Sequence, residues 1–153
     1  MTSNVNLFNN DLSEIQITYC NKVKASDRPK IQSSRDAYEN LMNIWTDIDH
    51  VEKFYVLLMN RSNRVLGYKL ISIGGISGTV SDPKVIFQTA LKANAACIIL
   101  SHNHPSGNTE PSQADVALTT KLVEVGKYLD LEVLDHLIVT SENYYSFADD
   151  GKL

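Results

Sequence analysis

The chain has 153 residues, of which 43% are hydrophobic and 21% charged, and its formal net charge is −4. This length suits one domain with a single buried core, and the composition is typical of a globular protein. The acidic balance argues against broad nonspecific binding to nucleic acids, which needs many Lys or Arg side chains. The apolar runs are too short to span a bilayer and no signal-peptide pattern opens the chain, so we expect a cytoplasmic protein without a membrane segment.

Residues 1–30 are expected to form an extended N-terminal arm that precedes a domain over residues 31–153. The alternation of apolar and polar residues over positions 14–19 predicts a strand that pairs at a sheet edge. A basic stretch follows, and it favours a solvated loop over a nucleic-acid surface because no aromatic residue interleaves with its charges. Its members are Lys22, Lys24, Arg28, Lys30 and Arg35.

The next segment predicts a helix and a hairpin. Ser33 or Ser34 is expected to cap a helix that runs to about Trp45, with apolar residues on one face. Residues 54–59 form a buried strand, and a turn over 61–64 leads to a second strand over 65–73. The glycine-rich residues 74–78 lack the remaining residues of a phosphate loop or a dinucleotide motif, so they are interpreted as a flexible strand exit.

Predicted helices and strands also alternate in the second half of the chain. Asp82 and Pro83 predict the start of a helix that ends near Ala93, and the apolar residues 95–100 predict a buried strand. A further helix is indicated by apolar residues spaced by three or four, and strands over 131–140 and 144–147 close the chain. That apolar stripe comprises Ala114, Leu118, Leu122, Val125 and Leu129. The alternation implies an α/β layered domain in which helices cover a central sheet.

Chemistry-bearing residues gather where the buried strand ends. Because alternate residues of an extended chain face the same side, the imidazoles of His102 and His104 can meet one metal ion. Asp115 adds a carboxylate. Three such ligands leave a fourth tetrahedral position for water, the arrangement of a catalytic zinc.

Ser112 and Asp115 also fit a capping box, in which Ser112 accepts from the first backbone N–H groups and Asp115 lies in the favourable first turn. The two interpretations are compatible, since a helix N-terminus beside a metal presents both side chains to the same point.

This combination resembles the RadC branch of the JAMM (MPN/JAB) metalloprotease superfamily. The resemblance extends over about residues 50–150 and is carried by the segments 96–107, 111–115 and 134–138. The superfamily pattern is a Glu, then His-x-His, ten residues and an Asp, with a Ser three positions before the Asp. The sequence His-Asn-His-Pro-Ser-Gly is specific to the RadC branch.

The resemblance implies a JAB1/MPN-like (cytidine-deaminase-like) layered α/β domain with a mixed central β-sheet flanked by helices. It also implies that His102, His104 and Asp115 bind Zn²⁺ and that Ser112 orients or stabilises the reacting oxygen. Glu52 stands just before the first core strand, at the place of the family's Glu, and is assigned as the general base.

Two assignments stay open at this point. Asp49, His50 and Glu39 lie near Glu52 in sequence and compete for its role. His136 shares a predicted strand face with Leu134 and Ile138; this favours a core histidine bonded to a neighbour over an outer partner of the metal site.

The function implied is a zinc-dependent hydrolase, a metallopeptidase or isopeptidase acting on an unknown protein or peptide substrate. The alternatives are a nucleic-acid-associated repair factor or metal-dependent nuclease, which the RadC label and the basic stretch from Lys22 to Arg35 support, and a catalytically idle interaction domain. RadC proteins usually carry an N-terminal helix-hairpin-helix module, and the first fifty or so residues show no such pattern. The sequence does not indicate an oligomeric state.

Overall fold

The computed structural model describes residue 16 and residues 22–74 and 80–153. The predicted strand over 14–19 and the glycine-rich segment 74–78 therefore lie outside the described residues, apart from Gln16 and Gly74. Within the described ranges, no helix is both long enough and apolar enough to cross a membrane.

A five-stranded sheet forms the centre of the fold, with strand order β2-β1-β3-β4-β5. Its strands are β1 (Lys53–Met59), β2 (Val65–Ile73), β3 (Cys97–Asn103), β4 (Glu132–Val139) and β5 (Tyr144–Ser146). β3 and β4 run parallel, whereas the other neighbours are antiparallel, so the sheet is mixed. The predicted hairpin over residues 54–73 is confirmed.

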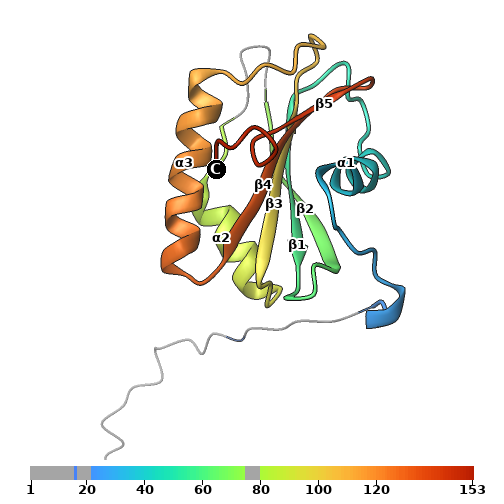
Figure 1. The fold of residues 1–153 in the computed structure, drawn as a ribbon, viewed down its shortest axis with the longest axis vertical. Coiled ribbons are helices and arrows are strands. Elements are labelled where there is room, and N and C mark those ends of the chain that lie inside the picture. The colour runs from blue at the N-terminus through green and yellow to red at the C-terminus, as the bar shows by residue number, and fades with distance from the viewer. Residues whose placement is uncertain (1–15, 17–21, 75–79) are drawn as a thin grey trace, which may run out of the picture.

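Among the described residues, three α-helices cover the sheet: α1 (Ser34–Met42) on one face, and α2 (Pro83–Lys92) and α3 (Gln113–Tyr128) on the other (Figure 1). A short 3-10 helix, η1 (Ala25–Asp27), precedes them. The predicted starts are correct, because Ser33 and Asp82 cap α1 and α2 through their side chains.

The predicted extension of the first helix to Trp45 is wrong. The backbone N–H groups of Ile44 and Trp45 both donate to the carbonyl of Leu41, at 3.0 and 3.1 Å, which closes the last turn and ends α1 at Met42. Trp45 is still buried, because the chain that leaves the helix packs its indole against the ring of Tyr55.

The central strands separate two apolar clusters. Tyr55 and Leu57 of β1 pack with α1, whereas Phe54 and Val56 pack with α2 and α3. Successive strand residues point to opposite faces, so a strand covered on both sides is buried along its whole length. Every residue of β1 and β3 is buried accordingly.

A β-bulge in β4 changes which side chains share a face. Val133 pairs with Ile98 and Asp135 with Ile99, so Leu134 is the extra residue. Leu134 consequently packs with the α1 cluster, whereas Val133 packs with α2 and α3. The expectation that His136 shares a face with Leu134 is wrong for this reason: His136 pairs with Leu100, whose side chain faces α2 and α3.

Gly126 of α3 provides a test of the packing between α3 and β4. A Cβ built at this position would overlap the backbone oxygen of Leu131. Replacing Gly by Ala inside a helix normally stabilises it by about 1 kcal/mol. Here we expect Gly126→Ala to lower the free energy of unfolding by about 1–3 kcal/mol, because a backbone atom must move. Urea denaturation followed by circular dichroism measures the change.

Gly67→Ala is the matched control, since a Cβ at Gly67 meets nothing within 4 Å. We expect it to be neutral or stabilising by up to about 1 kcal/mol. Equal effects of the two substitutions would contradict the close contact at Gly126.

Asp135 gives the fold a dependence on pH. Its Oδ1 accepts from the backbone N–H of His136 and Ala148 at 2.7 and 3.0 Å, and its Oδ2 accepts from Ser146 Oγ at 2.6 Å. Burial raises the pKa of this carboxyl, although these hydrogen bonds oppose the shift, and the charge of Asp149 adds to it. A raised pKa means that the folded chain holds the proton more tightly than the unfolded chain does, so this group destabilises the fold as pH rises through the raised value.

We therefore expect Asp135→Asn, whose amide can accept and donate in the same places, to gain stability relative to the wild type as pH rises from about 4 toward neutrality. Urea denaturation of both proteins across this range measures the difference. A difference that stays constant with pH would contradict the assignment.

Candidate metal centre

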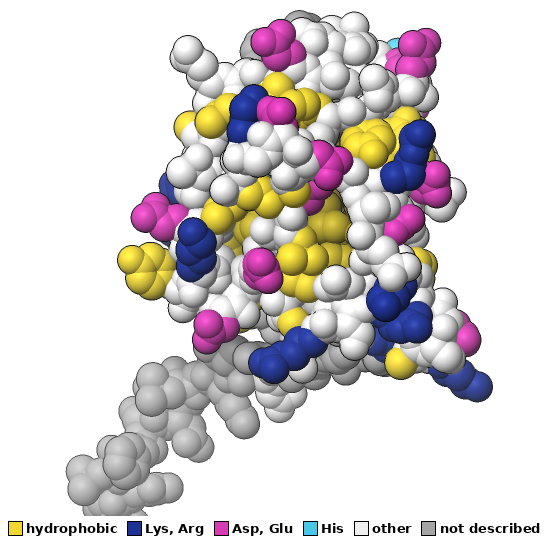
Figure 2. All heavy atoms as spheres, viewed as in Figure 1, with side chains coloured by type: hydrophobic (Ala, Val, Ile, Leu, Met, Phe, Trp, Pro, Cys, Tyr) yellow, Lys and Arg dark blue, Asp and Glu magenta, His cyan; other side chains and the backbone are white. Residues whose placement is uncertain are grey.

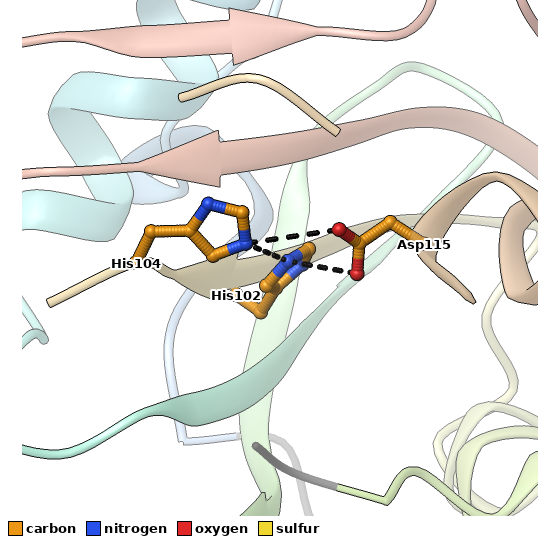
Figure 3. A group of neighbouring side chains, drawn as sticks. All are labelled: His102, His104 and Asp115. Atoms are coloured by element: carbon orange, nitrogen blue, oxygen red, sulfur yellow. Dashed lines mark hydrogen bonds and ion pairs between the residues drawn. The ribbon is translucent and has the colours of Figure 1, made fainter. Parts of the chain in front are cut away.

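The candidate ligands come from the end of β3 and the start of α3. β3 directs His102 to the face covered by α2 and α3, where its side chain is 2% exposed. His104 follows one residue after the strand, and its backbone N–H donates to the carbonyl of Val139 at 3.2 Å. Asp115 lies in the first turn of α3. The sheet and one helix N-terminus thus bring the three side chains together (Figure 3).

The donor atoms of these side chains converge. His102 Nε2 lies 3.0 Å from His104 Nε2 and 3.2 Å from Asp115 Oδ1, and His104 Nε2 lies 3.7 Å from Asp115 Oδ2. All three ligand atoms lie within 4.8 Å of one another, so the group could hold one metal ion.

The proton positions of His104 suit a cation. Its Nδ1 lies 2.6 Å from the backbone oxygen of Asn108, which can only accept a hydrogen bond. Nδ1 therefore carries the proton in the neutral ring, and Nε2 presents its lone pair to the centre. Two imidazole nitrogens and one carboxylate are ligands that zinc accepts, so these residues fit a Zn²⁺ ion.

The electrostatics of the centre favour positive charge. Burial raises the pKa of Asp115, but His102 and His104, whose rings donate to its carboxylate when they are charged, and the hydrogen bond from Ser112 outweigh burial and hold that pKa well below its usual range. The hydrogen bond that the charged ring of His104 makes to Asp115 raises the pKa of His104, and the nearby charge of Glu52 adds to the shift although burial opposes it. Asp115 is thus a carboxylate that attracts a proton or a metal ion.

Ser112 fixes the orientation of that carboxylate. Its backbone N–H and its Oγ both donate to Asp115 Oδ2 at 2.7 Å, and Ser112 Oγ accepts from the backbone N–H of Asp115 at 3.1 Å. This is the predicted capping box, which is confirmed. The cap occupies Oδ2 and leaves Oδ1 directed at His102, so capping and presentation of a ligand coincide.

Glu52 is half-buried and immediately precedes β1. The antiparallel pair Phe54 and His102 sets the register at this end of the sheet. Glu52 lies two residues before Phe54 and His104 two residues after His102, so both residues leave the paired strands at the same end of the sheet. The effect of its charge on the pKa of His104 agrees with this placement.

The competitors of Glu52 are directed elsewhere. Asp49 is exposed and its Oδ1 accepts from Ser141 Oγ at 3.0 Å. Glu39 is exposed on α1, which covers the opposite face of the sheet (Figure 1). His50 is exposed in the loop before β1.

Asn103 lies between the two histidines and was not singled out by the sequence reasoning. Its Oδ1 accepts from the backbone N–H of Lys53 at 2.7 Å, and its Nδ2 donates to the carbonyls of Ile48 and Val51 at 2.6 and 2.9 Å. Alternation along β3 points it away from the ligands, toward the loop that leads into β1. Asn103 therefore joins the segment around Glu52 to the strand that carries His102. A polar residue inside a fully buried strand end was the available signal.

His136 requires a correction. It is a fully buried core residue, as expected, but one of the neighbours that it contacts is the candidate ligand His102: His136 Nε2 lies 2.9 Å from His102 Nδ1. His136 is thus the outer partner of a candidate ligand, the interpretation that the sequence favoured less. Burial and the proximity of His102 keep the pKa of His136 well below its usual value.

Four members of the basic stretch lie before α1, and the fifth, Arg35, lies within that helix. Lys22, Lys24 and Lys30 are exposed, as a solvated loop predicts, and Lys and Arg side chains gather beside η1 in the lower right of Figure 2. For Arg28 the prediction is wrong. Its side chain is buried and donates twice to the backbone oxygen of Val23, because its guanidinium closes the turn around η1.

Comparisons with known proteins agree with this geometry. A family model described as a RadC-like JAB domain matches residues 31–152. A UPF0758 protein of Flavobacterium johnsoniae is 46% identical over 122 residues, which cover 80% of this chain and 53% of that protein. The UPF0758 protein YfjY of Escherichia coli is 44% identical over 102 residues, covering 67% of this chain and 64% of that protein. A UPF0758 protein of Methanosarcina mazei is 38% identical over 122 residues, again covering 80% of this chain and 53% of that protein.

The mixed sheet between helical layers and the His-His-Asp group at the end of β3 define a JAB-domain protein of the JAMM superfamily. Within that class, the chain belongs to the RadC family. The expected JAB1/MPN-like α/β fold is confirmed. The chain covers about half the length of several of the curated relatives it matches, at 53%.

Asn103→Ala tests the connection between the two strands that form the centre. Removing the amide leaves one buried N–H and two carbonyls without this partner, so we expect the free energy of unfolding to fall by about 2–4 kcal/mol. Asn40→Ala is the control, since Asn40 makes a single side-chain bond to the Asp36 carbonyl at 2.8 Å. It should change stability by about 0.5 kcal/mol or less. Urea denaturation compares the two, and equal effects would refute the role given to Asn103.

Proposed function

We propose that this chain is a zinc-dependent hydrolase of the JAMM type that cleaves a peptide or isopeptide bond in a protein or peptide substrate. The observation that carries the proposal is the convergence of His102, His104 and Asp115 within 4.8 Å. Three protein ligands with an open position are the arrangement of catalytic rather than structural zinc sites. Family membership supports the same reaction class.

His102 and His104 would hold the ion through Nε2 and Asp115 through its carboxylate. When bound, Zn²⁺ supplies Lewis acidity, which polarises a substrate carbonyl and makes water acidic near neutral pH. The remaining steps belong to the side chains around the ligands.

Glu52 acts as the general base. Its carboxylate takes a proton as the water oxygen forms a bond to the carbonyl carbon, and it passes that proton to the amine nitrogen as the carbon–nitrogen bond breaks. The products are a carboxylic acid and an amine. The position of Glu52 at the end of the sheet where β3 delivers His104, and its half-buried side chain, support this role.

Ser112 donates a hydrogen bond to the oxygen on which negative charge develops. In the structure its hydroxyl donates to Asp115 Oδ2, so this role requires a rotation about the side-chain bond. The backbone N–H of Ser112 also donates to Oδ2, and it retains the carboxylate during that rotation.

The proposal predicts about one equivalent of tightly bound zinc in the purified chain. His104→Ala should lose it, because two ligands remain, whereas His50→Ala, which removes an exposed histidine away from the centre, should retain it. Glu52→Gln should retain zinc and cleave peptides at least about 100-fold more slowly. Elemental analysis measures the metal, and mass spectrometry of a proteome-derived peptide library measures cleavage.

Two results would overturn the proposal. If folded wild-type protein holds no zinc after dialysis against the metal, the proposed zinc site is ruled out. If the wild type and Glu52→Gln cleave peptides at equal rates, Glu52 is not the general base.

A further inference from the structure

A row of hydrogen-bonded side chains runs behind the candidate ligand His102. His102 Nδ1 lies 2.9 Å from His136 Nε2, and His136 Nδ1 lies 2.6 Å from Thr119 Oγ1. Thr119 Oγ1 lies 2.6 Å from the backbone oxygen of Asp115. The row therefore connects two of the three candidate ligands through groups that do not reach the metal position themselves.

The hydroxyl of Thr119 fixes the direction of the row. It has one hydrogen, and the carbonyl of Asp115 can only accept, so that hydrogen lies between Thr119 and Asp115. Toward His136 the hydroxyl oxygen can then only accept. His136 Nδ1 must therefore be the donor in the 2.6 Å contact.

The proton on His136 Nδ1 determines the proton on His102. A neutral imidazole has one donor and one acceptor nitrogen, so His136 Nε2 accepts. His102 Nδ1 is consequently the donor in the 2.9 Å contact, and His102 Nε2 is left with a free lone pair. That nitrogen is the one directed at His104 and Asp115.

Packing holds the middle of the row in place. His136 is 0% exposed, and its ring stacks on Phe147 at 5.0 Å between centroids, with Phe54 at 5.6 Å on a tilted plane. Thr119 is 1% exposed. Both partners are buried, so the row acts on the proton of His102 from the side of the ring that faces away from the metal position.

We propose that Thr119 and His136 are positioning residues that fix His102 in the tautomer with an unprotonated Nε2, the form that can bind a metal ion. The first turns of α3 thereby do two things: Asp115 supplies a ligand, and its backbone carbonyl, through Thr119, sets the proton on another ligand. The inference rests on the proposed zinc site, and it concerns the preparation of the ligand before the metal arrives.

Thr119→Val tests the proposal, because valine keeps the shape of threonine and removes the hydroxyl. His136 then has no acceptor at Nδ1 and can move its proton to Nε2. His102 Nδ1 would accept, and its Nε2 would carry a hydrogen into the metal position. We expect zinc affinity, measured by competition with a chromophoric chelator, to fall about 10- to 100-fold.

Two further substitutions separate this effect from a general disturbance of α3. Thr119→Ser keeps the hydroxyl and should bind zinc within about 3-fold of the wild type, well inside the loss expected for the valine variant. Thr120→Val removes the neighbouring hydroxyl, which donates to the Val116 carbonyl on the exposed side of the same helix at 3.0 Å. It should leave the affinity unchanged. Affinities of the valine and serine variants that equal one another would overturn the inference.

Metal-free wild-type protein gives a second measurement that does not depend on a variant. Long-range ¹H–¹⁵N correlation spectra of the histidine rings report which nitrogen carries the proton. We expect protons on Nδ1 of His102, His104 and His136. A proton on Nε2 of His102 would refute the proposal, whether or not Thr119→Val folds.

The same experiments distinguish this inference from the proposed function. Zinc binding that depends on Thr119, without any cleavage of peptides, supports the positioning role and rules out the proposed hydrolase function. If the wild-type protein binds no zinc, the proposed hydrolase function is ruled out. The spectra of the histidine rings still decide the tautomer of His102.

Discussion

The antiparallel pairing of β1 with β3 is the constraint on which the rest of the structure depends. The pair Phe54 and His102 fixes the register, and alternation then sends His102 toward α2 and α3 and Asn103 toward the opposite face. A slip of one residue would exchange the two faces and place the candidate ligand in the apolar cluster beneath α1. Asn103 opposes such a slip, because its amide bonds both to Lys53 and to the loop before β1. The register therefore serves the core and the centre together.

The N-terminus of α3 has an equally double role. The hydrogen bonds of the capping box at Ser112, which begins α3, also hold Asp115 Oδ2. The carboxylate is therefore oriented by the same groups that satisfy the first backbone N–H groups of the helix. One turn further on, Thr119 lies in the interface between α3 and β4, where its hydroxyl contacts His136. Structural and chemical demands fall on the same few residues here, so substitutions near this helix end are expected to change folding and metal binding together.

Much of the site could be predicted from the sequence, because its ligands lie in local patterns. His102 and His104 differ by one period of a strand, and Ser112 and Asp115 by one helical turn, so short-range geometry brings each pair together. Other features depend on contacts between distant segments. The bulge at Leu134 turns His136 toward the centre, Leu41 ends α1 before Trp45, and Arg28 turns inward to bond Val23. No local pattern marks these three positions, since each is decided by a partner that the sequence does not indicate.

By itself, the sequence determined the order of helices and strands, the alternation of layers and the identity of the convergent donor groups. These follow from periodicity, from caps and from the chemistry of side chains, all of which act over a few residues. Only the tertiary structure decided that Glu52 lies at the same end of the sheet as His104, that Asn103 joins the two central strands and that His136 stands behind His102. Such pairings are set by sheet register and by a bulge, which bring together residues as far apart as His102 and His136.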